Sequence, residues 1–248
     1  MTNTKKRVVF TQGGKGGVGK TTLANDMADW YRGRGISVKM LDFDWENEAA
    51  SGFSFFNKEA EKFNINEPGS LDAILAILDD SQNDVMLIDQ AAASGQKTFE
   101  WFAEVGETAR EMGIVFTSVG LVTADPGSVE SVMKWTAALD DTADYLIVKN
   151  KMENPSEQFS AWHKNKLAQE LSHEFDYREV VMGSRLAEFE ELIRTTGVTP
   201  AQAAEAKKGE LASTRWKIRA KSYAKQAGEM LDSVSDLLLP PESDEATQ

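Results

Sequence analysis

The amino-acid sequence predicts an α/β fold with a single, doubly wound, mostly parallel sheet and helices on both faces. Short apolar segments rich in β-branched residues alternate along the chain with longer segments of helical periodicity. The apolar segments are continuous, which is typical of parallel strands buried on both faces. A glycine-rich loop at 12–22 (QGGKGGVGKTT) joins the first strand to the first helix. Right-handed crossovers would place helices on both faces and a ligand crevice at the carboxyl ends of the strands.

Each element follows from its own residues. The first helix begins after the glycine-rich loop, because Leu23, Met27 and Trp30 recur at spacings of four and three. Strands are predicted at 8–11, 36–43, 84–89, 113–122, 143–149 and 177–182. Further helices are predicted near 69–80, 97–112, 126–140, 156–173, 185–196 and 211–238. We predict one domain over residues 1–239 and a disordered tail over 240–248, which is acidic and led by prolines.

Composition restricts the function. The chain of 248 residues is 41% hydrophobic, enough for a full core, and it has no cysteine, which excludes disulfides, iron–sulfur clusters and thiolate zinc sites. No apolar run approaches the roughly 18–20 residues that a membrane helix needs. These features predict a cytoplasmic protein. The net charge of −13 argues against nucleic-acid binding over the whole surface, so any such contact must come from a local patch.

The glycine-rich loop matches a phosphate-binding motif. Residues 14–21 fit G-x-x-x-x-G-K-[ST] between a predicted strand and a predicted helix, the setting that this motif requires. Its backbone N–H groups and the helix N-terminus would bind phosphate oxygens, Lys20 would contact the β- and γ-phosphates, and the Thr21 hydroxyl would hold Mg²⁺. The alternative is a glycine-rich turn that binds nothing. The predicted nucleotide-binding residues are Gly14, Lys15, Gly16, Gly17, Val18, Gly19, Lys20, Thr21 and Thr22.

Two predicted strands end in aspartates. Asp89 follows a buried apolar strand and is predicted to support the bound magnesium, although such a residue can also be a helix N-cap or a turn residue. Strand alternation places Asp42 and Asp44 on the same side. One of the two could orient the attacking water, while the other supports the loop lysine and the metal.

The string K-G-G-x-G-K-[ST] at 15–21, followed by D-x-D at 42–44 and an apolar-D at 87–89, resembles the deviant Walker A ATPases of the ParA/MinD type, in the SIMIBI class. The resemblance covers roughly residues 7–150. It implies an ATP-sandwich homodimer in which Lys15 reaches the phosphates bound by the other subunit. For a lysine outside such a string, a solvated loop cation is the favoured interpretation.

The same resemblance assigns the other site residues. Lys20 becomes the loop lysine and Thr21 the Mg²⁺ ligand. Asp44 becomes the water-positioning aspartate and Asp89 the Walker B aspartate, and Asn150 matches an asparagine that contacts adenine. The implied cofactors are ATP and Mg²⁺.

The chain departs from the family pattern at two places. Asp89 is followed by Gln-Ala-Ala-Ala-Ser-Gly, where many ParA proteins have Thr-Pro-Pro-Gly, and Met182-Gly183-Ser184-Arg185 replaces an expected proline–arginine. These departures are closer to the plasmid-encoded TraL- and StbB-like branch. The Asp-Gln sequence leaves the behaviour of the loop after Asp89 open.

The last predicted helix carries two stripes. Trp216, Tyr223, Met230 and Leu237 recur every seven residues and predict a packing stripe. Five cations lie within eleven residues of an otherwise acidic chain: Arg215, Lys217, Arg219, Lys221 and Lys225. They form either a solvated amphipathic face or a weak DNA contact without sequence preference. A membrane anchor is disfavoured, because the chain ends in prolines and acidic residues.

The sequence therefore predicts an ATP-dependent dimerisation switch with slow ATP hydrolysis. Its predicted role is DNA or plasmid partition, positioning or conjugal transfer, with a partner protein that stimulates hydrolysis. The alternative is a metabolic P-loop enzyme of the dethiobiotin-synthetase or cobyrinate-amidase type, which transfers phosphate to a small carboxylic acid.

Overall fold

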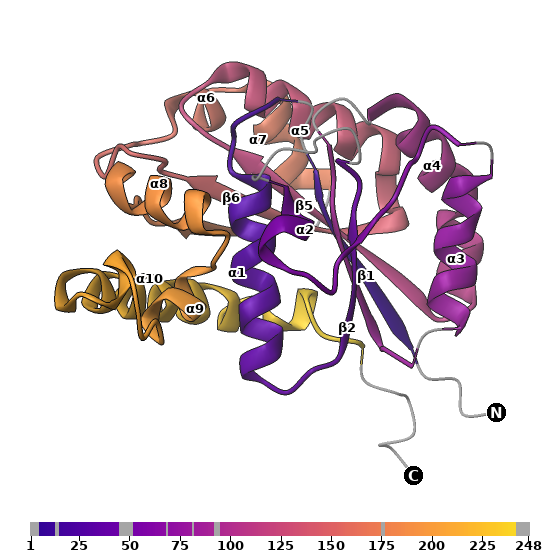
Figure 1. Cartoon of the computed structure of the whole chain (residues 1–248). Helices are drawn as coiled ribbons and strands as arrows, with labels where there is room; N and C mark the ends of the chain where they lie inside the picture. The colour runs from indigo at the N-terminus through magenta and orange to yellow at the C-terminus, as the bar shows by residue number, and fades with distance from the viewer. Residues whose placement is uncertain are drawn as a thin grey trace, which may run out of the picture.

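The computed structural model describes residues 5–12, 15–44, 52–67, 69–80, 82–91, 95–174 and 177–241. Its centre is a sheet of seven strands in the order β3-β2-β4-β1-β5-β6-β7, and every pair of neighbours is parallel (Figure 1). The predicted doubly wound α/β fold is confirmed. The strands are β1 Lys6–Gln12, β2 Val38–Asp42, β3 Glu61–Lys62, β4 Val85–Asp89, β5 Ile114–Val122, β6 Ala143–Asn150 and β7 Tyr177–Met182.

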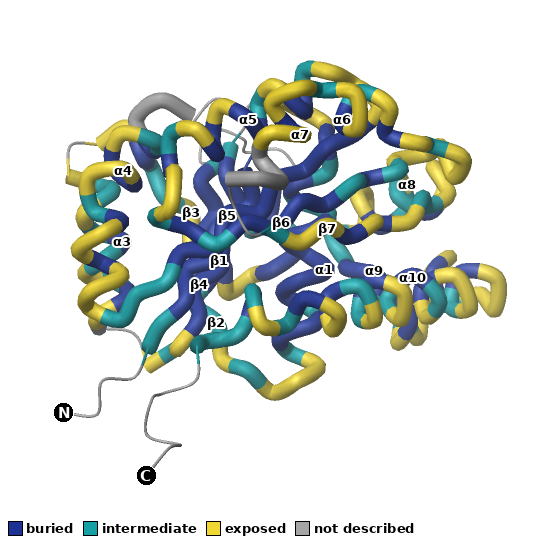
Figure 2. Tube along the Cα trace, turned by 180° about the vertical axis from the view of Figure 1, so that it is seen from behind, coloured by how far each residue is buried: buried dark blue, intermediate teal, exposed yellow. Residues whose placement is uncertain are grey.

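Helices cover both faces of this sheet. One apolar core packs α1, the end of α10 and the 3₁₀ turn after it against β1, β4, β5 and β6, and a second core packs α3, α4 and α5 against the opposite face. Figure 2 shows the inner strands β1, β4, β5 and β6 as the buried centre of the molecule, whereas the edge strands β3 and β7 and the outer sides of the helices carry exposed residues. The helices are α1 Lys20–Gly33, α2 Phe53–Phe56, α3 Ser70–Asp80, α4 Gly95–Glu111, α5 Pro126–Leu139, α6 Ser160–His163, α7 Lys166–Glu174, α8 Ala187–Thr196, α9 Pro200–Ala204 and α10 Thr214–Asp232. Short 3₁₀ helices lie at Asp140–Thr142, Glu210–Ala212 and Ser235–Leu237.

The long helix predicted at 156–173 is wrong. The chain forms α6 and α7 there, because the Asn165 side chain accepts a hydrogen bond from the N–H of Ala168 and starts a new helix. The helix predicted at 211–238 is shorter, since α10 is flanked by two 3₁₀ turns. The elements α2, β3 and α9 were not predicted. Only α9 has a clear signal, the capping box formed by Thr199 and Gln202 around Pro200.

The predicted packing stripe of the last helix is confirmed. Trp216 and Tyr223 of α10 are buried with Phe189 of α8, and Met230 and Leu237 pack partly buried against the core that contains α1. The cluster around α8, α9 and α10 forms a lobe beside α1 at one side of the sheet (Figure 1). No helix in the described part of the chain is long and apolar enough to cross a membrane.

Candidate nucleotide-binding site

The glycine-rich loop connects β1 to α1 through two positions whose backbone conformation favours glycine. Gly17 has φ of 74° and Gly19 has φ of 99°, both in the left-handed region. A Cβ on Gly19 would also clash with the side-chain amide of Asn150. That amide, at the end of β6, donates a hydrogen bond of 2.9 Å to the carbonyl of Val18. Asn150 therefore braces the loop from the neighbouring strand, while its predicted contact with adenine stays a prediction.

Lysine, threonine and aspartate meet at the start of α1. Lys20 is buried, and its Nζ donates to the Lys15 carbonyl at 3.2 Å. The Thr21 hydroxyl donates to Oδ2 of Asp89 at 2.7 Å, and the Thr11 hydroxyl of β1 donates to Oδ1 at 2.8 Å. The strand-end aspartate and the loop threonine that the motif singled out are thus in direct contact.

Burial shifts the pKa values of Asp89 and Lys20 in opposite directions. It raises the pKa of Asp89 to about 6, against the hydrogen bonds from Thr21 and Thr11, which lower it. Burial also lowers the pKa of Lys20, while the charges of Asp89 and Asp44 raise it. A bound cation would favour the ionised carboxylate and a bound phosphate the ionised ammonium. Each group therefore suits one part of a magnesium–nucleotide pair.

The residues fit a magnesium ion held mainly by a nucleotide. Mg²⁺ usually keeps several waters and takes only one or two protein ligands together with phosphate oxygens. Thr21 and Asp89 offer one hydroxyl and one nearby carboxylate. Within the described ranges, no group of three or more His, Cys, Asp or Glu could hold a metal by itself. The site therefore suits a metal that arrives with its phosphates.

The two aspartates at the end of β2 differ from each other. Asp42 is fully buried; its Oδ1 accepts the N–H of Asp44 at 3.1 Å, and its Oδ2 accepts the N–H and hydroxyl of Ser54 at 2.8 and 2.7 Å. Asp42 therefore holds α2 against the sheet. Asp44 lies beyond the strand and is partly exposed. The metal role of Asp42 and the water-positioning role of Asp44 stay predictions.

Lys15 lies at the surface of the loop. Its side chain is 48% exposed, and its Nζ lies 3.0 Å from Oδ2 of Asp125. Asp125 caps α5 by accepting the N–H of Gly127 at 2.7 Å, and the hydrogen bond from Lys15 lowers the pKa of Asp125. The ammonium group is therefore held at the edge of the loop, where a second molecule could approach it. Gly14 lies outside the described residues.

A cavity of about 400 Å³ opens beside the first turns of α1. Thr21, Thr22 and Asn25 line it on the α1 side, and Arg185 and residues of α8 line it opposite. Because Thr21 borders both this cavity and the phosphate loop, a nucleotide with its phosphates on the loop could place its nucleoside here.

The five cations predicted on the last helix all belong to α10. Arg215, Arg219, Lys221 and Lys225 are exposed and Lys217 is half-buried. Arg215 pairs with Glu188 at 2.6 Å and Lys225 with Glu229 at 3.6 Å. Lys217, Arg219 and Lys221 form no ion pair with the described part of the chain.

The parallel sheet, the loop and the strand-end aspartate define a P-loop nucleotide-binding protein. A profile of the CobQ/CobB/MinD/ParA nucleotide binding domain matches residues 9–233, and the chain belongs to this family. Protein MobD of Acidithiobacillus ferrooxidans is 22% identical over 162 residues, which cover 65% of this chain and 71% of MobD.

Solved structures share the fold. The MinD cell division protein of Aquifex aeolicus superposes with a TM-score of 0.51 at 13% identity, covering 96% of this chain and all of MinD. The MinC:MinD cell division protein complex of the same organism gives a TM-score of 0.50 at 14% identity, covering 89% of this chain and 95% of that one. At these identities the likeness concerns the fold.

Sequence reasoning missed three side chains of the site. Thr11 is the second donor to Asp89, Ser54 holds Asp42, and Asp125 pairs with Lys15. The Asp125-Pro126 pair is a readable helix-start signal, but its lysine partner is 110 positions away. Thr11 and Ser54 carry no signal of their own.

Proposed function

We propose that this protein is an ATP-dependent dimerisation switch with slow ATP hydrolysis, acting in DNA or plasmid partition, positioning or conjugal transfer. The observation that carries the proposal is the contrast between two loop lysines. Lys20 is buried beside Thr21 and Asp89, whereas Lys15 is held at the surface on Asp125. A buried lysine suits phosphates bound by the same subunit, and a surface lysine can reach those of a second subunit.

The proposed chemistry is water attack on the γ-phosphate. The water oxygen bonds to phosphorus and releases a proton to solvent, the bond from phosphorus to the bridging oxygen breaks, and ADP leaves with that oxygen. Lys20 and Lys15 would stabilise charge on the transferring group, Thr21 and Asp89 would hold Mg²⁺, and Asp44 would position the water. Family membership and the resemblance of the loop support these roles.

Molecular mass with and without nucleotide tests the switch. Light scattering should show a dimer with ATP and a smaller species with ADP. Asp44→Ala should accumulate as a stable ATP dimer, because hydrolysis normally dissolves it, and Lys15→Ala should bind ATP without dimerising or hydrolysing it. Normal turnover by Lys15→Ala would exclude the cross-subunit role. A wild type that stays monomeric with ATP and phosphorylates a small carboxylic acid would favour the metabolic alternative.

We further propose that the ATP dimer binds DNA without sequence preference through the cations of α10. The support is the exposure of four of the five and the lack of ion pairs at Lys217, Arg219 and Lys221 within the described residues. A dimer doubles the number of cations, and each neutralised phosphate contributes a slope of about −0.9 in log K against log salt. Binding should therefore require ATP and weaken steeply with salt.

A gel-shift series over salt and nucleotide tests this contact. Changing Lys217, Lys221 and Lys225 together to Glu should abolish the shift and leave basal hydrolysis unchanged. The matched control changes three exposed lysines elsewhere, Lys134, Lys164 and Lys166, to Glu with the same change in net charge. Equal loss in both triple variants would reduce the effect to overall charge. No shift for the wild type with ATP at low salt would assign DNA contact to a partner protein.

A further inference from the structure

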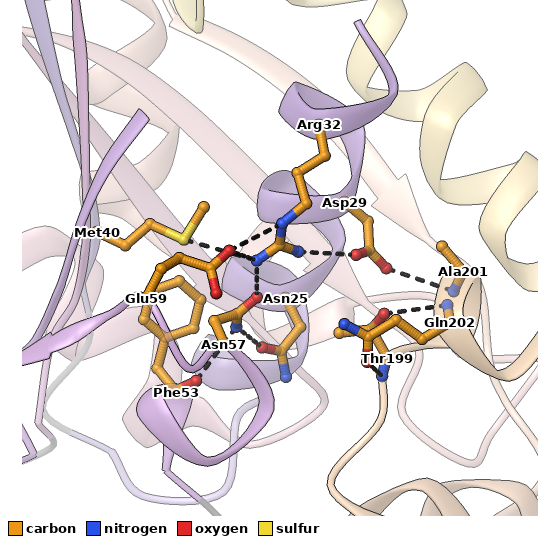
Figure 3. Close-up of polar contacts among 10 residues, drawn as sticks. All are labelled: Asn25, Asp29, Arg32, Met40, Phe53, Asn57, Glu59, Thr199, Ala201 and Gln202. Atoms are coloured by element: carbon orange, nitrogen blue, oxygen red, sulfur yellow. Dashed lines mark hydrogen bonds and ion pairs between the residues drawn. The ribbon is translucent and has the colours of Figure 1, made fainter. Parts of the chain in front are cut away.

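A polar network on α1 joins two segments that are distant in the sequence (Figure 3). At its centre, the guanidinium of Arg32 donates in three directions: to Oδ1 of Asn57 at 2.5 Å, to Oε1 of Glu59 at 3.0 Å from Nε, and to Oδ1 of Asp29 at 3.0 Å. Its side chain is 33% exposed, so the network is partly shielded from solvent. The planar fork of an arginine fixes the relative positions of the groups that it bonds.

One arm of this network leads to α2 and the end of β2. Asn57 is buried directly after α2, and its amide donates to Oδ1 of Asn25 on α1 at 2.7 Å. At the other end of α2, Ser54 donates its N–H and hydroxyl to Asp42. Helix α2 is therefore bonded both to α1 and to the strand end that precedes Asp44.

The opposite arm leads to α9. The second oxygen of Asp29 accepts the N–H of Ala201 at 3.3 Å, in the first turn of α9, beside the capping box of Thr199 and Gln202. Burial raises the pKa of Asp29, while the Thr199 side chain and Arg32 lower it. Asp29 thus bonds Arg32 with one oxygen and α9 with the other.

Helix α9 in turn packs on the cationic helix. Ala203 and Ala204 share an apolar cluster with Trp216, Ala220 and Tyr223 of α10, and four of the five cations of α10 are exposed. A displacement of α9 would therefore move α10, because close-packed apolar contacts transmit shifts between helices.

We propose that Arg32 and Asp29 are positioning residues that couple α2, which is bonded to Asp42, to α9 and the cationic face of α10. Nucleotide at the phosphate loop would act on Asp44 and the end of β2, α2 would shift with Asp42, and Arg32 would pass the shift to Asp29 and α9. Hydrogen bonds from one guanidinium to Asn57, Glu59 and Asp29 make this path stiff, since α2 cannot move without Arg32 following or losing partners. The inference rests on the proposed nucleotide switch and adds the route by which the switch reaches α10.

Hydrogen exchange with and without the Mg²⁺ complex of a non-hydrolysable ATP analogue tests the coupling. In the wild type, amide exchange should change by about threefold or more at 15–22, at 53–60 and at 200–220. Arg32→Met should keep the changes at 15–22 and 53–60 and lose the change at 200–220. Asp29→Asn, which keeps the side-chain shape, should give the same pattern if Arg32→Met folds poorly.

Arg110→Met is the matched control, because Arg110 is an exposed arginine of α4, which packs on the face of the sheet opposite to α1. It should keep all three changes. If Arg32→Met keeps the change at 200–220, the coupling through Arg32 is wrong. The coupling is also wrong if the wild type responds at 53–60 but not at 200–220. Neither outcome contradicts the proposed nucleotide switch. A wild type without any change at 15–22 would instead overturn the proposed function itself.

Discussion

Asp89 and Asp42 end the neighbouring strands β4 and β2, lie directly opposite each other in the register of the sheet, and are both buried. Asp89 accepts hydrogen bonds from Thr11 and Thr21, on β1 and at the start of α1. Asp42 accepts hydrogen bonds from Ser54 and from the backbone of its own strand end. The two aspartates occupy equivalent positions in the sheet but bond different segments: Asp89 bonds β1 and the start of α1, and Asp42 bonds α2. We call the end of β4 at Asp89, beside the phosphate loop, the centre, and the end of β2 at Asp42, which holds α2, the flank.

The largest expected effect lies at the centre. Lys20→Ala should reduce ATP affinity by at least about 100-fold, or roughly 3 kcal/mol, because the loop loses its buried cation. Titration calorimetry measures it. Lys134→Ala, which removes an exposed lysine of α5, should leave affinity unchanged. Similar losses in both variants would show that the loop is not the phosphate site.

The next largest effect is expected in the pH dependence of stability, through Asp89. The folded-state pKa of Asp89 is raised from 3.8 to about 6, so its protonated form stabilises the fold at low pH and this contribution disappears as pH rises through about 6. Between pH 5 and 8, the wild type without nucleotide should lose roughly 1–2 kcal/mol of unfolding free energy relative to Asp89→Asn. Urea denaturation at several pH values measures it. Parallel pH profiles would mean that Asp89 is already ionised at pH 5.

Magnesium should separate the two aspartates directly. Asp89→Asn should raise the magnesium concentration required for half-maximal ATP binding by about tenfold or more, because a carboxylate near the ion is lost. Asp42→Asn should change it by less than about threefold, since the Asp42 oxygens already accept bonds from Ser54 and Asp44. Magnesium titrations at fixed ATP give both values. An equal loss in the two variants would instead support the predicted metal role of Asp42.

The smallest effect should appear on the flank. Ser54→Ala removes the hydroxyl bond to Asp42 but keeps the backbone bond, so the unfolding free energy should fall by about 0.5–1.5 kcal/mol with ATP affinity unchanged. Ser156→Ala, at an exposed turn, should change it by less than about 0.5 kcal/mol. Loss of ATP affinity in Ser54→Ala would show that α2 belongs to the phosphate site after all.

Most of the sheet could be predicted because its strands are continuous apolar segments, and all six predicted strands are present. The short elements could not. The β3 strand is two residues long, and α2 exists because Asp42 and Asn25 bond its two ends. The predicted helix at 156–173 is divided near Asn165 by a side chain that bonds locally to the backbone, which periodicity does not register.

By itself the sequence determined the parallel sheet, the phosphate loop and the candidate residues Lys20, Thr21 and Asp89, because each depends on neighbours within a few positions. Only the tertiary structure decided that Asp42 bonds α2, that Lys15 lies on Asp125, and that Arg32 joins α2 to α9 through Asp29. These contacts link segments from different parts of the chain. Which polar side chains meet depends on how α1 and its neighbours pack on the sheet, and a local pattern does not contain that packing.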